Sequence, residues 1–195
     1  QGGTGHTQFA DILAGNGTLV VDNTNGGAAP STSALGRAMF NNSGNTFSGT
    51  VQILDGGNFM NLATAPTYSA VDIAAGGYMS LIGGRTTTVG ALTGAGSITK
   101  NTASDTATLR VGNGNVSCAF DGIIAQNLLL STGTVALTKI GSGTLTLTGA
   151  STYTGTTTLN NGTLAMDPGA VIGNGTGTLD FRGDVMTVGR EATND

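Results

Sequence analysis

The sequence predicts an all-β chain that coils into a right-handed parallel β-helix, or β-solenoid. Three observations predict this fold class: glycine occupies 34 of 195 positions, short strands alternate apolar residues with threonine, and a turn-and-strand unit recurs along the chain. Rungs of about 20 to 25 residues give roughly eight or nine rungs, with irregular loop insertions.

The composition excludes several other classes. Glycine costs roughly 1 kcal/mol per helix position relative to alanine, so a helical protein is not expected. The glycines follow no Gly-X-Y period, which excludes collagen. Hydrophobic residues make up 38% of the chain, more than a disordered Gly/Ser linker carries, whereas tryptophan is absent and charged residues reach only 9%. We therefore expect a thin, aliphatic core.

The strands are marked by a strict period of two. Leu145 and Leu147 alternate with threonines, and the same pattern covers Leu164 with Met166 and Val135 with Leu137. One face of each strand is therefore aliphatic and the other polar, as in a strand with one buried side. Between two of these strands, Asn161-Gly162 predicts a tight turn with positive φ angles.

A Gly-x-Gly-Thr/Ser turn leads into several of the strands. It occurs at Gly15–Thr18, Gly94–Ser97 and Gly141–Thr144, and each is followed at a variable distance by an aromatic-x-Gly motif. An antiparallel sandwich spaces its strands more evenly and buries larger aromatic residues. Repeated units that bury one face on a neighbour favour the solenoid.

The whole chain, residues 1–195, is expected to form one elongated domain. Residues 89–181 carry the best repeats, 1–88 carry degenerate rungs and loops, and 182–195 form a final rung or tail. Within this span the segments Val89–Lys100, Ala107–Gly112, Leu137–Gly149 and Thr152–Leu164 resemble the passenger-associated transport repeat of bacterial autotransporter-type proteins. The resemblance implies a β-helical passenger displayed on the bacterial cell surface or released outside the cell.

The sequence offers no catalytic, cofactor-binding or metal-binding constellation. Its acidic residues are dispersed, with Asp180 and Asp184 around Arg182 as the densest charged group, and His6 is the single histidine. A lyase or hydrolase acting on polysaccharides needs converging carboxylates, so this activity is only a remote alternative. Cys118 is the single cysteine and is expected to be a small core residue.

Charge and hydropathy limit the partners. The net charge is −4 and the seven cations form no cluster, so we expect no nucleic-acid partner. No apolar run reaches the 18 or more residues that a membrane-spanning helix needs, so we expect no membrane insertion by this chain.

These observations predict a non-enzymatic structural protein, either a stalk or a subunit of an extracellular fibre. An uncapped solenoid exposes strand edges at both ends, which favour end-to-end self-association. The candidate contacts are Phe9, Ile12 and Leu13 near one end and Val185, Met186 and Val188 near the other. The alternative is an adhesin that binds a glycan or protein through loops such as Gly26–Arg37 or Leu62–Ser69.

Overall fold

The computed structural model describes residues 7–22, 37–100, 105–126, 133–173, 178–182 and 185–188. In 7–8, 37, 181 and 185–188 the description covers the main chain. The described residues form strands, turns and coil without a helix, and every strand pairing is parallel. The predicted fold class, a parallel β-solenoid, is confirmed. Among these residues there is accordingly no helix long and apolar enough to cross a membrane.

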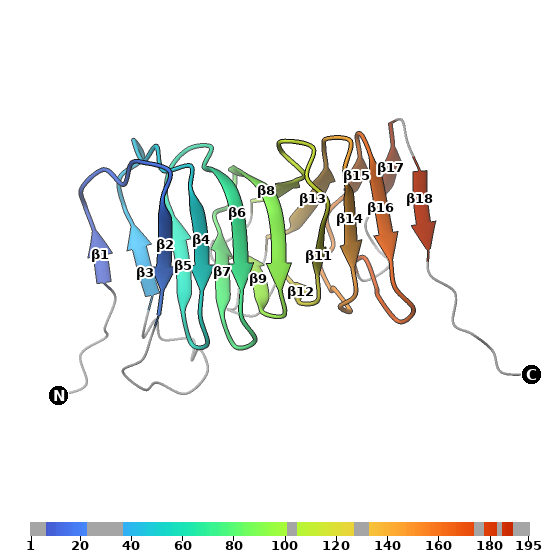
Figure 1. Cartoon of the computed structure of the whole chain (residues 1–195), viewed down its shortest axis with the longest axis horizontal. Helices are drawn as coiled ribbons and strands as arrows, with labels where there is room; N and C mark the ends of the chain where they lie inside the picture. The colour runs from blue at the N-terminus through green and yellow to red at the C-terminus, as the bar shows by residue number, and fades with distance from the viewer. Residues whose placement is uncertain are drawn as a thin grey trace, which may run out of the picture.

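The strands stack into three parallel sheets along a rod (Figure 1). One sheet has six strands: β1 (Thr7–Phe9), β3 (Arg37–Phe40), β5 (Asn58–Asn61), β7 (Tyr78–Leu81), β9 (Ser97–Lys100) and β12 (Ile123–Ile124). A second has eight: β2 (Thr18–Val21), β4 (Thr50–Ile53), β6 (Thr67–Ile73), β8 (Thr86–Gly94), β10 (Ala107–Val111), β13 (Val135–Lys139), β15 (Thr157–Leu159) and β17 (Leu179–Phe181). The third has four: β11 (Cys118–Phe120), β14 (Thr144–Leu147), β16 (Thr163–Met166) and β18 (Val185–Val188).

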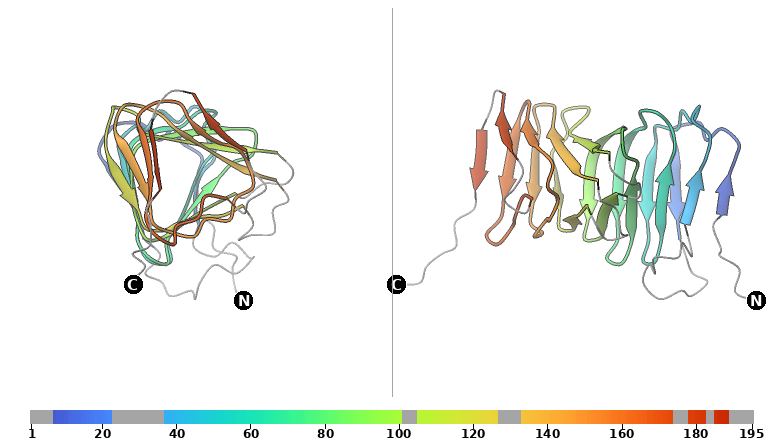
Figure 2. Two further views of the ribbon diagram at one scale, coloured as in Figure 1. Left: turned by 90° about the vertical axis from the view of Figure 1, so that its right-hand side faces the viewer. Right: turned by 180° about the vertical axis from the view of Figure 1, so that it is seen from behind.

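The rod has a three-sided cross-section, which is visible when it is viewed end-on (Figure 2, left). Successive turns differ in length: Ser97 pairs with Tyr78, 19 residues earlier, whereas Thr50 pairs with Thr18, 32 residues earlier. The solenoid makes about six turns, fewer than the eight or nine rungs expected. The expectation was too high because insertions lengthen several turns beyond the 20 to 25 residues assumed.

The core lies inside the coil and follows the period of two. Leu145, Leu147 and Leu164 are fully buried, and the threonines between them are half-buried on the outer face. Because parallel pairing stacks equivalent positions, Leu145 lies beside Leu164 and Leu147 beside Met166 in the next turn. Burying each such side chain contributes roughly 1.5 to 3 kcal/mol, so these columns hold successive turns together.

Glycines form the corners between strands. Gly141 and Gly162 have positive φ angles of 69° and 78°, which favour glycine over residues with a Cβ. The predicted turn at Asn161-Gly162 is therefore present, although Asn161 has an ordinary negative φ angle. The turn joins two strands that pair with different neighbours, β15 and β16, so it is a corner of the coil and not a hairpin.

A polar network crosses the interior near β5. Buried Asn61 donates to the Tyr68 hydroxyl at 2.9 Å and accepts from the side chain of Asn45 at 3.0 Å. Asn61 also accepts from the backbone N–H of Ala63 at 2.9 Å. The buried phenol thereby has a partner, as a polar group inside a core requires.

Candidate functional site: the end surfaces of the solenoid

The first described turn presents apolar side chains at one end of the rod. Phe9 in β1 is 43% exposed and Ile12, in the segment that follows, is 60% exposed. Both were predicted as end contacts, and the structure places them on the turn that has no described turn beyond it (Figure 1). Exposed side chains of this size on a terminal turn form a hydrophobic contact surface.

A column of aromatic rings runs from this end into the core. The Phe9 ring stacks on Phe40 with centroids 4.8 Å apart and an interplanar angle of 12°. Phe40 contacts Phe59 at 5.7 Å, and Phe59 meets Tyr68 edge-on at 5.8 Å. The rings behind Phe9 are buried, whereas the outer ring is not. The column therefore ends on an accessible aromatic face.

Leu13, the third predicted contact at this end, has a different role. Its side chain is half-buried and packs against the core. Its N–H donates to Asn45 Oδ1 at 2.7 Å, and its carbonyl accepts from the N–H groups of Thr46 and Phe47 at 2.9 and 3.0 Å. Leu13 is thus bound to the following turn and stabilises the end without forming its outer surface.

The sequence analysis missed Val20, which is 51% exposed. In β2 the alternation turns Val21 into the core and Val20 to the outside. Val20 would have been recognisable from the same period of two that identified the inward residues. With Phe9 and Ile12 it defines an apolar end surface, hereafter the N-terminal end surface.

At the opposite end the edge strands are β17 and β18. The main chain places Val185, Met186 and Val188 beside Thr163, Leu164 and Met166 of β16. Met186 and Val188 therefore stand at the register positions of two buried residues. Leu179 of β17, which the sequence analysis did not select, is 39% exposed. We call the edge strands β17 and β18 the C-terminal end surface.

Few charges lie on these end surfaces. Strands β2 and β18 have no ionisable residue. In β17 the carboxylate of Asp180 accepts from Arg182 Nε at 2.7 Å. Natural edge strands are commonly protected from pairing by lysines or by charges that point inward. Here the one charged pair neutralises itself, and the adjoining edges stay open to pairing.

A buried cation occupies a corner in the middle of the best repeat. Lys139, at the end of β13, is fully buried. Its ammonium donates to the carbonyl oxygens of Ile140 at 2.7 Å, Gly141 at 2.8 Å and Asn161 at 3.2 Å. A Cβ at Gly162 would lie 2.8 Å from Nζ, so glycine leaves room for the ammonium. Lys139 joins two turns and is a structural group.

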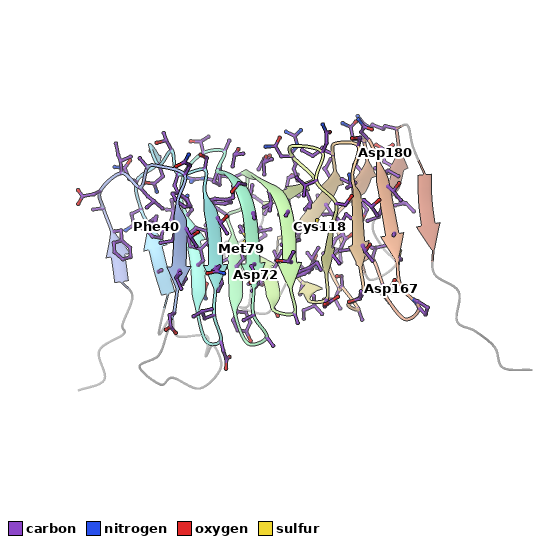
Figure 3. All side chains as sticks on the ribbon, in the orientation of Figure 1. Phe40, Asp72, Met79, Cys118, Asp167 and Asp180 are labelled. Atoms are coloured by element: carbon purple, nitrogen blue, oxygen red, sulfur yellow. The ribbon has the colours of Figure 1, made fainter. Side chains whose placement is uncertain are left out.

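The described residues bring no catalytic or metal-binding groups together. Asp72, Asp167 and Asp180 lie well apart along the rod (Figure 3), and no three His, Cys, Asp or Glu side chains there could share a metal ion. Asp72 accepts from Thr93 at 2.6 Å, in an array of surface side chains. Cys118 is half-buried against the core, and burial raises the pKa of its thiol, which disfavours the reactive thiolate.

The fold and the repeating corner chemistry define a parallel β-solenoid repeat protein. Residues 137–166, which span β13 to β16, match the family model of the passenger-associated-transport-repeat. The resemblance inferred from the sequence is thereby confirmed.

One curated relative is the adhesin BmaC autotransporter of Brucella suis biovar 1 (strain 1330). It is 33% identical over 109 residues, which cover 55% of this chain and 3% of that adhesin. The matched region is thus a small part of a much longer protein. No solved structure matches the chain.

Proposed function

We propose that this chain is a non-enzymatic, extracellular β-solenoid of a bacterium, displayed at the cell surface or secreted, that acts as a stalk or as a fibre subunit by end-to-end stacking. The observation that carries this proposal is the pair of apolar end surfaces joined by continuous parallel sheets. The autotransporter repeat and the adhesin relative support the extracellular location. The absence of converging ionisable groups among the described residues supports a structural role.

The edges supply the physical driving force. The carbonyl oxygens of Gly17 and Val21 accept from Thr50 and Leu54 of the next turn, so the main-chain groups of Thr18 and Val20 face away from it. Alternate residues of a strand bond to opposite neighbours, and an unpaired edge is a template for another strand. A second solenoid would satisfy these groups and cover Val20 in one step.

Purified chain tests the fibre proposal directly. Sedimentation across a concentration series should show association that grows with concentration, and electron microscopy should show filaments one solenoid wide. A monodisperse monomer at high concentration would reject end-to-end stacking while leaving the stalk role of a single solenoid intact.

Adhesion is the second candidate, and the similarity to an adhesin favours it. Of the two loops considered from the sequence, 26–36 lies outside the described residues. Leu62–Ser69 is a corner of the coil held by Arg85, whose guanidinium donates to the Leu62 and Ala63 carbonyls. Binding of the chain to a glycan array or to host cells would support adhesion, and the alanine variants of surface residues that abolish it would locate the site.

A further inference from the structure

A column of residues occupies the corner that precedes β2, β4 and their counterparts in later turns. Five of its members are glycines and the other two are Ser69 and Val116. The strand registers place them in this order: Gly17, Gly49, Ser69, Gly90, Val116, Gly143, Gly162. We call this set the corner column.

Each later glycine of the corner column lies under a carbonyl of the preceding turn. A Cβ added at Gly49 would lie 1.9 Å from the Gly17 oxygen, and one at Gly90 would lie 2.2 Å from the Ser69 oxygen. At Gly143 and Gly162 the corresponding distances to a carbonyl oxygen are both 2.4 Å. Real Cβ atoms do not approach that closely, so these positions need glycine for reasons of space.

Gly17 has the same place in the column but no such neighbour. No heavy atom of the described residues lies within 4 Å of a Cβ built at Gly17, and its φ angle is not positive. Neither space nor backbone conformation in the described chain therefore requires glycine there. The residue matches its column only if another turn lies above it.

From this mismatch we infer that the N-terminal end surface receives the C-terminal end surface of a second copy of this chain, with the main chain before its β18 lying over Gly17. The inference rests on the proposed stacking function and adds the contacting strands and their register. The edge of β2 then pairs with β18 of the second copy as β4 pairs with β2 within one chain.

The lengths and residue types of the two strands fit this pairing. Both β2 and β18 have four residues and neither is charged. If the internal register continues, Thr18 pairs with Val185, Leu19 with Met186, Val20 with Thr187 and Val21 with Val188. Leu19 and Val21 then extend the columns that begin with Leu164 and Met166, through Met186 and Val188.

The apolar contents of these columns agree with the register. Leu19 packs against the core and Val21 is buried, and they lie beside Val51 and Ile53 of the following turn. A shift by one residue would place Val20 over the core positions and Val21 outside. The register that continues the coil is therefore the one that buries apolar residues on both sides of the junction.

Gly17→Ala and Gly17→Val test the inference without disturbing the fold, because the described chain leaves room for the added side chain. Both variants should have the circular dichroism and unfolding curve of the parent as monomers, and should lose filaments and concentration-dependent sedimentation. Ala119→Val is the matched control, since it adds bulk on an exposed position in the middle of the rod and should assemble normally. Normal filaments from Gly17→Val would overturn the inference.

Disulfide trapping tests the register. In a Cys118→Ser background, Val20→Cys with Thr187→Cys should form an oxidised ladder of covalent multimers, because paired strands lie roughly 4.8 Å apart, within the Cα range of a disulfide. Val20→Cys with Val185→Cys is offset by two residues, roughly 8 Å, and should remain monomeric on denaturing gels.

The outcomes separate this inference from the proposed function. Filaments in which only the offset pair cross-links would overturn the register and leave stacking standing. A parent chain that never associates would overturn both. Cross-linking by the matched pair alone, together with loss of filaments in Gly17→Val, supports the β2–β18 junction.

Discussion

Phe9 stacks on Phe40 in nearly parallel planes, with ring centroids 4.8 Å apart, at the first turn of the solenoid. Phe40 is buried, so the pair marks the boundary between the core and the N-terminal end surface. The ring of Phe9 covers the core of its own turn and also offers its outer face to a neighbour. Its removal therefore affects two measurable properties.

Phe9→Ala should lower the free energy of unfolding of the monomer by about 1 kcal/mol, since a stacked aromatic pair contributes about 0.5 to 1.5 kcal/mol. It should also raise the concentration at which the chain assembles. Urea unfolding and sedimentation measure the two effects. Val116→Ala, at a valine that is also exposed but lies away from the ends, should leave assembly unchanged. Equal effects of the two substitutions on assembly would argue against an end contact by Phe9.

Lys139→Met should destabilise the chain by about 3 kcal/mol, because three carbonyl oxygens that accept from the ammonium would lose their buried donor. Chemical denaturation of Lys139→Met and of the control Arg110→Met gives the comparison. Arg110 is exposed in β10, so the control should change stability by less than about 0.5 kcal/mol. A Lys139→Met protein as stable as the parent would show that the ammonium contributes nothing net to the corner.

Gly122→Ala should cost about 3 kcal/mol or prevent folding, because its Cβ would lie 1.9 Å from the Gly96 oxygen of the preceding turn. Gly17→Ala is the matched glycine substitution. As a monomer it should unfold within about 0.5 kcal/mol of the parent, since its Cβ meets no described atom. Thermal unfolding below the assembly concentration compares the pair, and equal losses of stability would contradict the stacking of carbonyls over glycines.

Alkaline pH should unfold the chain through its buried phenols. Burial raises the pKa of Tyr153 from 10.0 to about 12, against a smaller opposing effect of its hydrogen bond with Thr157, and burial also raises the pKa of Tyr68. A raised folded-state pKa leaves stability intact below pH 10 and removes it as the pH climbs from 10 towards 12, because the unfolded chain ionises first.

Tyr153→Phe should flatten this alkaline loss of stability, at a cost of about 1 kcal/mol at neutral pH for the 2.6 Å hydrogen bond between the Tyr153 and Thr157 hydroxyls. Tyr78→Phe is the control, since it removes a tyrosine without touching either buried phenol. Unfolding free energies measured between pH 8 and 12 distinguish the variants. Identical pH profiles of the parent and Tyr153→Phe would refute the role of this phenol.

Much of the rod could be predicted from local pattern. The alternation at Leu145, Leu147 and Leu164 correctly assigned buried and outer positions, because side-chain direction in a strand depends on residue parity alone. The number of turns was overestimated, since the length of an insertion does not alter the pattern on either side of it. The end contacts were predicted at the level of strands; Phe9 and Ile12 are exposed, whereas Leu13 is bound to its neighbouring turn.

The sequence by itself determined that the chain forms short strands with one apolar face, that glycines turn them, and that the repeat is of the passenger-associated transport kind. Only the tertiary structure decided which carbonyl lies over which glycine, that Lys139 is buried, and that Gly17 has nothing above it. These facts depend on contacts between residues 19 to 32 positions apart, such as Tyr78 with Ser97 and Thr18 with Thr50. Because the separation changes from turn to turn, no fixed spacing in the sequence reveals them.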